Sequence, residues 1–337
     1  MAITSHKCPN CGAEIKFDPE TQGGKCEFCL SEFSVAEVEA MESINGENYN
    51  TNLYNCPRCG AEIIADNNTT VTFCCYCNGQ VILSDKLVGD FKPSKIIPFK
   101  YTKDKAIEEF LKWSKGKWFL PNEFTSYKQL EKISGVYVPF WLLDSDVTTS
   151  IRAEARKVKT WTSGGYRYTK TDVYEVYRTA NLSFDNIPGN ASTKMDDDIM
   201  ESIEPFNKEE IKPFSMSYLP GFISDKHDKS KEQVLPIMKN KIQIVAKDIV
   251  RNSIKGYSSV SIKNDDTSFN TINPSYALLP VWLLVYSHNG TDYIFAMNGE
   301  TGKIFGELPL SKSKLAIMFI IVVIATFLIV LAGGLLL

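Results

Sequence analysis

The stretch CPNCGAEI at residues 8–15 returns 48 positions later as CPRCGAEI at residues 56–63, and each copy is followed by a second CxxC pair. Fourteen residues separate the two pairs in both copies. Zinc binds four thiolates as a tetrahedron, and two CxxC turns joined by a hairpin supply that ligand set. The pattern predicts two tandem zinc ribbons, whose ligands are Cys8, Cys11, Cys26 and Cys29 in the first and Cys56, Cys59, Cys74 and Cys77 in the second.

The predicted metals are structural, because each ribbon has four protein ligands and no position left open for water. The sequence starts without the apolar stretch of a signal peptide, so paired cysteines indicate metal rather than disulfides. Two Zn²⁺ ions are expected, although a rubredoxin-type iron site uses the same paired turns. Cys75 is interpreted as a spare thiol, and His6 as a surface residue rather than an alternative ligand.

The ribbons are too small to bury a sufficient core, so their metals are expected to supply the missing stability. A tight CxxC turn favours glycine after the second cysteine, because glycine tolerates the left-handed conformation that such a turn needs. Gly12 and Gly60 occupy this position. A polar connector joins the two copies, which are expected to move as separate modules on a short link.

The stretch Leu315–Leu337 is an uncharged run of 23 residues, above the roughly 20 that cross a bilayer core. A buried core helix is the less favoured alternative, since such helices are usually shorter and broken by polar positions. Lys312 and Lys314 precede the run. Because positive charge marks the cytoplasmic side, we expect a single-pass plasma-membrane protein whose bulk is cytoplasmic.

The region between the ribbons and this run reads as a mixed domain with antiparallel strands. Apolar periodicity predicts helices at 102–115, 196–204 and 231–254, and β-branched and aromatic alternation predicts strands at 136–155, 166–184, 276–287 and 291–309. The strings VPFWLL at 138–143 and LPVWLL at 279–284 resemble each other. They indicate central strands of one sheet, two related subdomains, or simply two buried strands.

The charge distribution argues against nucleic acid, the usual partner of zinc ribbons. Residues 1–90 contain five Lys or Arg against thirteen Asp or Glu, and two four-thiolate zinc centres bring this segment to about −12. Affinity for nucleic acid depends largely on Lys and Arg that neutralise phosphates. The overall charge of −3 therefore hides an acidic head followed by a basic segment at 91–160.

Few residues indicate an enzyme. The sequence has no GxxxxGK[ST] loop and only three histidines, so no nucleotide motor and no Ser-His-Asp set is indicated. The acidic run Asp196–Asp198 could bind a divalent cation, but favourable charge at a helix N-terminus is the preferred interpretation. We therefore expect a non-enzymatic protein without catalytic residues.

The duplicated CPxCGAEI modules, the terminal span and the strings IIPFK, GVYVPFWL, MDDDIMESIEP and AMNGETGKIFGELP together resemble the bacterial membrane-anchored proteins that contain a TFIIB-type zinc ribbon. The resemblance runs through nearly the whole chain. It implies zinc at all eight cysteines and offers no catalytic residues. It also implies partners of two kinds, because some relatives accompany phage-shock-protein-A-like and SPFH (flotillin-like) proteins in membrane-stress systems.

The sequence thus predicts an α+β protein with ribbons at 1–44 and 45–90, a mixed cytoplasmic domain at 91–310 and a tail anchor at 315–337. The predicted function is a membrane adaptor that docks cytoplasmic protein partners through its acidic ribbons. The alternative is a membrane-associated nucleic-acid-binding zinc-ribbon protein of the replication or transcription kind.

Overall fold

A computed structural model describes residues 3–4, 6–41, 53–55, 62–64, 69–73, 80–83, 92–288 and 290–334. The strands are β1 (Ile3–Thr4), β2 (Ile15–Asp18), β3 (Gly23–Cys26), β4 (Glu32–Phe33), β5 (Leu53–Asn55), β6 (Glu62–Ile64), β7 (Thr69–Phe73), β8 (Gln80–Leu83), β9 (Lys95–Ile96), β10 (Ser134–Ser163), β11 (Tyr166–Asn190), β12 (Lys212–Pro213), β13 (Ile223–Asp225), β14 (Ser259–Phe269), β15 (Asn273–His288), β16 (Thr291–Asn298) and β17 (Ile304–Gly306). The helices are α1 (Val35–Ala40), α2 (Lys103–Ser114), α3 (Tyr127–Leu130), α4 (Asp197–Ser202), α5 (Lys231–Asn252) and α6 (Lys312–Gly334). The predicted α+β class is confirmed.

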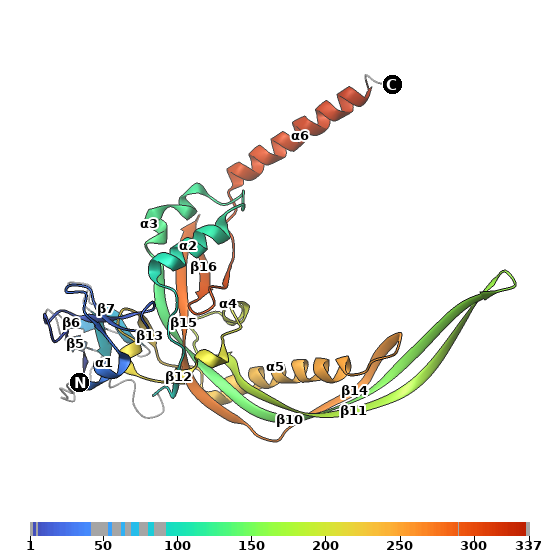
Figure 1. Cartoon of the computed structure of the whole chain (residues 1–337). Helices are drawn as coiled ribbons and strands as arrows, with labels where there is room; N and C mark the ends of the chain where they lie inside the picture. The colour runs from blue at the N-terminus through green and yellow to red at the C-terminus, as the bar shows by residue number, and fades with distance from the viewer. Residues whose placement is uncertain are drawn as a thin grey trace.

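One sheet organises the body, with the strand order β1-β8-β7-β13-β10-β15-β16-β17 (Figure 1). Its central pair is β10 and β15, which run antiparallel with Val138 opposite Leu279. The two similar strings of the sequence are therefore neighbours in one sheet. Most pairs are antiparallel, as predicted, but β13 joins β10 and β9 joins β15 in parallel.

The strand β10 is long enough to leave the body and form an arm. Beyond Asp144 it no longer pairs with β15, and it continues between β11 and β14. Helix α5 lies along this arm and closes a small core with Ile151, Val176 and Val250. Figure 1 shows the ribbon of β10 and β11 extending far past the end of α5.

An aromatic cluster forms the centre of the body core. The Phe99 ring, which is fully buried, stacks on Phe222 with ring centroids 4.0 Å apart and meets Tyr137 and Trp282 edge-on. Phe17 of β2, which is far from the body in the sequence, also packs on Phe222, with ring centroids 6.4 Å apart. The N-terminal cysteine segment is thus tied into the body core.

The expected independence of the two N-terminal modules is wrong for the described strands. In the first copy, the Phe17 backbone N–H donates to the Pro220 carbonyl over 2.9 Å, and Lys105 forms an ion pair with Glu20 over 2.9 Å. In the second copy, β7 pairs with β13 of the body sheet. Both copies are held against the body by backbone pairing with distant segments. The composition of the connector carries no signal for this pairing.

The predicted helices are confirmed with small shifts at their ends. Thr102 caps α2, and α5 runs over Lys231–Asn252. On α5 the buried face holds Val234, Met238 and Ile242, whereas Val245 and Ile249, which the spacing placed on that face, are about half exposed. Ala246 and Val250 take their places in the core.

The helix α6 projects from the body with its apolar side chains exposed (Figure 1). Its segment Lys312–Val330 is long and apolar enough to cross a membrane, and the rest of the molecule buries none of it. Its base is fixed, because the Ser311 backbone N–H donates to the Phe119 carbonyl over 2.8 Å and the Lys314 Nζ donates to the Leu120 carbonyl over 2.6 Å.

Candidate metal centre

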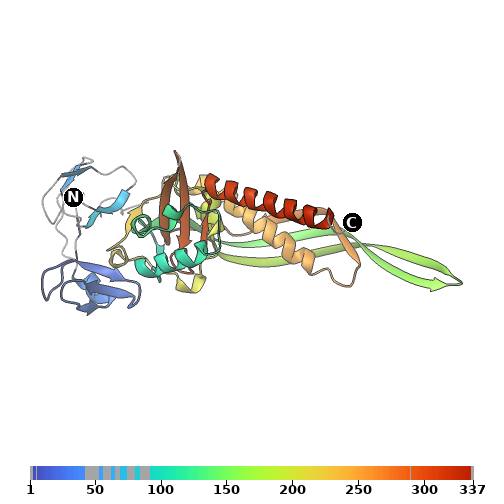
Figure 2. The ribbon, with the colours of Figure 1, turned by 90° about the horizontal axis from the view of Figure 1, so that it is seen from above.

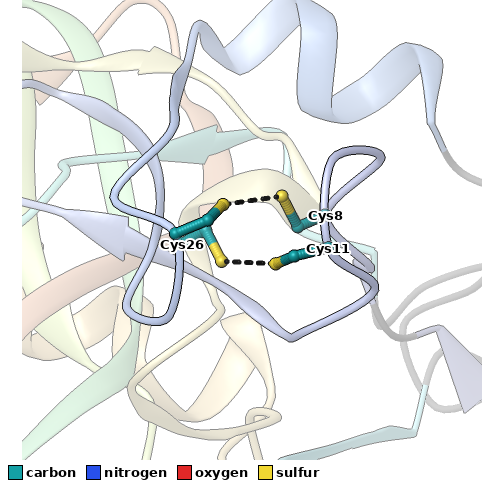
Figure 3. Close-up of side chains that lie close together, drawn as sticks. Cys8, Cys11 and Cys26 are labelled. Carbon is teal, nitrogen blue, oxygen red and sulfur yellow. Dashed lines mark hydrogen bonds between the residues drawn. The ribbon is translucent and has the colours of Figure 1, made fainter.

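The first four predicted ligands meet at one point. The Sγ atoms of Cys8, Cys11, Cys26 and Cys29 all lie within 4.8 Å of one another, with Cys8 to Cys29 and Cys11 to Cys26 each at 3.5 Å. Figure 3 shows Cys8, Cys11 and Cys26 pointing toward one another from two separate turns. Within the described residues, this is the group of ligand side chains close enough to hold a metal ion.

The spacing of the sulfurs fits a tetrahedral ion. A Zn–S bond of about 2.3 Å places tetrahedral sulfurs about 3.8 Å apart, within the range that the four side chains span. Cys8 and Cys26 are buried, whereas Cys11 is exposed. All four ligand positions come from protein, so a metal held here would be structural rather than catalytic.

Two equivalent turns position the ligands. In the first turn the Gly12 N–H donates to the Cys8 carbonyl over 2.8 Å, and in the second the Leu30 N–H donates to the Cys26 carbonyl over 2.9 Å. Gly12 has φ 76°, which confirms the predicted left-handed glycine. Leu30 takes the same conformation with φ 60°, although a leucine there is strained. The hydrogen-bonded CxxC turn therefore overrides local preference at Leu30.

The pKa values of two of the thiols, Cys29 and Cys11, are shifted in opposite directions. The Ser31 hydroxyl, its backbone N–H and two neighbouring thiols lower the pKa of Cys29 to about 6. The Ala13 N–H lowers the pKa of Cys11, but burial and hydrogen bonds to the other three thiols outweigh it and raise that pKa to about 12. A divalent ion removes this conflict, because it stabilises all four thiolates at once.

Apart from the cysteines and from Phe17, which packs into the body core, this segment has only a small apolar core. The buried cluster contains Ile15 and Val38 together with Cys8 and Cys26. The helix α1 supplies Val38 and is held at its start by Ser34, whose hydroxyl accepts from the Glu37 N–H while the Glu37 carboxylate accepts from the Ser34 N–H. We call residues 6–41 the cysteine module.

Replacing Ser31 by alanine tests the predicted support of the ligands. The Ser31 hydroxyl lies 3.2 Å from the Cys29 Sγ, and Asn10 donates to it over 2.8 Å. Loss of such a supporting hydrogen bond weakens metal affinity by about 10-fold to 100-fold. Competition with a chromophoric chelator on the full chain measures this change. Thr21→Ala, on an exposed turn of the same module, is the control and should leave affinity unchanged.

The second predicted site lies outside the described residues, including Cys56, Cys59, Cys74, Cys77 and the spare Cys75. Its flanking strands are described, and they repeat the first copy in register. Asn55 opposite Glu62 matches Lys7 opposite Glu14, and Phe73 opposite Gln80 matches Lys25 opposite Glu32, each shifted by 48 positions. The backbone on both sides of each CxxC pair is therefore duplicated, and the second metal site stays a prediction.

The prediction of a surface position for His6 is wrong. Its side chain is only 4% exposed, and its carbonyl accepts from the Ile15 N–H over 2.9 Å. Burial lowers the pKa of this imidazole. His6 does not belong to the group of ligand atoms around the cysteines.

The acidic run Asp196–Asp198 is explained by the helix that it starts. Asp196 is the N-cap of α4 and accepts from the Ile199 N–H over 3.1 Å. Asp197 forms an ion pair with Lys229 over 2.8 Å. These contacts support the preferred interpretation of favourable charge at a helix start.

Sequence reasoning missed an exposed apolar pair on the second turn. Phe28 and Leu30 are 81% and 68% exposed, beside the acidic side chains of Glu27 and Glu32. Inspection of the residues between Cys26 and Cys29 and of the residue after Cys29 could have found this pair, because neither Phe28 nor Leu30 is buried in a core.

The fold and the cysteine cluster define a class: an α+β protein with a candidate four-thiolate metal centre and a C-terminal helix apolar enough to span a membrane. No family model matches the sequence. No solved structure matches it either.

A protein of Bacillus subtilis (strain 168), described as uncharacterized protein YdjG, is 38% identical over 333 residues. The match covers 97% of this chain and 96% of that protein. The chain therefore belongs to the YdjG family.

Proposed function

We propose that the chain is a non-enzymatic membrane adaptor, anchored by α6, which presents a metal-stabilised cysteine module to protein partners in the cytoplasm. Zinc occupies the described four-cysteine cluster, and a second zinc occupies the duplicated site at Cys56, Cys59, Cys74 and Cys77. The partners are cytoplasmic proteins of a membrane-stress system, of the phage-shock-protein-A-like or SPFH kind.

The anchoring is supported by the surroundings of the base of α6. Trp118 is 73% exposed there, and Lys115, Lys117, Lys312 and Lys314 lie within the two segments that meet at this base. Tryptophan is enriched at membrane interfaces, and lysines beside a span favour the cytoplasmic side. We call these five residues the collar. The composition of the collar supports our proposal that the body sits on the cytoplasmic face of the plasma membrane.

The observation that carries the docking role is the exposed pair Phe28 and Leu30 on the metal-binding turn. The body separates this turn from α6, and both views show the N-terminal strands and α6 on opposite sides of the molecule (Figures 1 and 2). Contiguous exposed apolar side chains mark protein-interaction sites, and Phe28 and Leu30 flank the same ligand, Cys29. The N-terminal strands that carry this turn thus lie across the body from α6, where a cytoplasmic partner can reach them.

The acidity of the module favours a protein partner over nucleic acid. Residues 6–41 contain three Lys against seven Asp or Glu, and a four-thiolate zinc centre adds a charge of about −2. A polyanion is repelled by such a surface. A basic face of a protein is attracted to it.

Co-purification from detergent extracts tests the adaptor role. The wild-type chain should recover the same cytoplasmic partners from repeated preparations, and Cys8→Ser with Cys11→Ser should lose them while the chain stays in the membrane fraction. Partners that remain after the metal is lost would contradict the docking role.

The alternative, a membrane-associated nucleic-acid-binding protein, has a separate test. It requires the detergent-solubilised full chain to shift DNA or RNA fragments at low salt, and to release them as salt rises. Our proposal expects no shift at any salt concentration.

A further inference from the structure

The end of the ribbon formed by β10 and β11 has an unusual composition. Residues 155–171 contain five basic side chains and no acidic one. The same segment contains Trp161, Tyr166 and Tyr168, which are 49%, 73% and 47% exposed. We call residues 155–171 the ribbon tip. Its turn is Gly164–Gly165, where both residues have positive φ.

The strand register divides the ribbon tip into two faces. Successive side chains of a strand point to opposite sides, and directly opposed residues share a side. Lys159 lies opposite Lys170 and Trp161 opposite Tyr168, so these four share one face. The rings of Trp161 and Tyr168 stack with centroids 5.7 Å apart. Threonines dominate the other face. One face therefore combines aromatic rings with lysines.

The charges on this face do not stabilise the ribbon. Like charges directly opposite each other on neighbouring strands are destabilising. On this face Lys170 has Asp172 at 3.1 Å, but within the described part of the chain Lys159 forms no ion pair, and neither does Arg167, which lies opposite Thr162 on the other face. An external anion would satisfy these cations.

Beyond Arg156 the rest of the described fold supports the ribbon tip only at Lys157, which lies 5.6 Å from the Tyr257 ring, and at Val158, whose N–H donates to the Ser258 Oγ over 3.0 Å. The pairing of β10 with β14 ends at Arg156, and the core under α5 reaches no further along β10 than Ala155. Seven residues from Lys157 to Ser163 then continue as a two-stranded ribbon, over roughly 23 Å at about 3.3 Å per residue. An isolated two-stranded ribbon is marginally stable in water.

The ribbon tip and α6 leave the body on the same side. Figures 1 and 2 both show them extending away from the N-terminal strands, and Figure 1 shows the ribbon curving toward the side to which α6 points. A membrane crossed by α6 therefore lies on the side of the body from which the ribbon tip also extends.

From this placement we infer that the ribbon tip binds the headgroup region of the same membrane, with its aromatic rings at the interface and its basic side chains on anionic phospholipids. The inference rests on the proposed anchoring by α6. Tryptophan and tyrosine favour the headgroup level, and each Lys or Arg near an anionic surface adds to binding. The chain then contacts its membrane at two points, the collar and the ribbon tip, which fixes the orientation of the body.

Quenching of tryptophan fluorescence tests this contact in the full chain. The chain is reconstituted into nanodiscs of phosphatidylcholine with or without phosphatidylglycerol, whose acyl chains are brominated near the headgroup. Subtracting the emission of Trp161→Phe isolates Trp161, and Trp118→Phe isolates the collar in the same way. We expect the Trp161 emission to fall by roughly twofold or more in the anionic discs, as for a ring at the interface.

Charge reversal provides the matched comparison. Lys159→Glu with Arg167→Glu should abolish the Trp161 quenching, because each basic side chain removed weakens binding to an anionic surface by about fivefold. Lys92→Glu with Lys132→Glu changes two exposed lysines of the body and should leave the quenching unchanged.

Three outcomes would overturn the inference. Quenching of Trp118 without quenching of Trp161 would leave the anchor intact and remove the tip contact. Quenching of neither would remove the anchoring as well. A change of Trp161 emission with short DNA, but not with anionic lipid, would make the ribbon tip a nucleic-acid site.

Discussion

Replacing Cys26 by serine should remove the metal from the cysteine module and unfold it, while the body stays folded. The Cys26 side chain is fully buried and approaches Cys11 to 3.5 Å, so a weaker oxygen ligand cannot move to restore the geometry. Structural zinc contributes about 10–16 kcal/mol to the folding of zinc-finger peptides, far more than the small core around Ile15 and Val38 can supply. Metal analysis of the purified full chain should show a loss of about one ion per chain.

The spare cysteine provides the control for this experiment. Cys75→Ser removes a thiol from the second copy without removing a predicted ligand, so metal content should stay at the wild-type level. Hydrogen exchange of β2 and β3 should accelerate in Cys26→Ser, whereas exchange of β10 and β15 should not. An unchanged metal content in Cys26→Ser would show that the cluster holds no metal in solution.

Removal of residues 312–337 should transfer the chain from the membrane fraction to the soluble fraction. The helix α6 packs against the body only at its base, so its loss leaves the body core intact. Each Leu, Ile, Val or Phe near the centre of a span contributes about −0.3 to −0.6 kcal/mol to the free energy of insertion. The sum of these contributions over α6 determines whether the chain stays in the membrane. Carbonate extraction of membranes, followed by detection of the chain, measures the change.

A pair of point variants sharpens this test. Ile321→Lys with Val322→Lys places charge at mid-span at a cost of about 2.5–3.5 kcal/mol per residue, so extraction should increase. Ile321→Leu with Val322→Leu keeps the span apolar and should behave as wild type. A truncated chain that resists extraction would contradict anchoring by α6.

The features with a strong local pattern were predictable from the sequence. The helix α2, the strands around Val138 and Leu279, and the first four cysteines follow from apolar periodicity or ligand spacing. Each of these signals lies within one short window of residues, which is why sequence reasoning reaches it. The apolar run after Lys314 is of the same kind.

Features that depend on distant partners were not predictable. The strand β14 has apolar alternation only at Val260 and Ile262 and is polar from Lys263 to Ser268, so its sequence signal is short and pairing with β10 defines it. The strands β7 and β8 join the body sheet through β13, a three-residue strand with no signal of its own. The continuation of β10 beyond Val158 follows from its pairing with β11, and the core under α5 does not reach that far.

In the candidate site, too, some features were predictable from the local sequence and others were not. Cysteine spacing predicts the ligands, and Gly12 fits the turn that follows the first pair. The left-handed Leu30 and the exposure of Phe28 follow from the metal-binding turn itself, which constrains the backbone whatever residue occupies it. The docking proposal therefore rests on a feature that only the structure displays.

The central claim is that the second metal-binding turn docks a cytoplasmic protein at the membrane, and crosslinking from position 28 tests it most directly. A photoreactive phenylalanine analogue replaces Phe28 in the full chain in native membranes, and the same analogue at Ile244, on the exposed face of α5, serves as the control. Leu30→Asn, which keeps a residue that tolerates positive φ, removes the apolar neighbour without disturbing the turn.

Our account predicts one discrete adduct with a cytoplasmic protein from position 28 and none from position 244. It also predicts that Leu30→Asn reduces this adduct several-fold while metal content and membrane location stay unchanged, because truncating a residue that anchors an interface costs about 2 kcal/mol or more. No adduct from position 28, or an adduct that Leu30→Asn leaves intact, would contradict the claim.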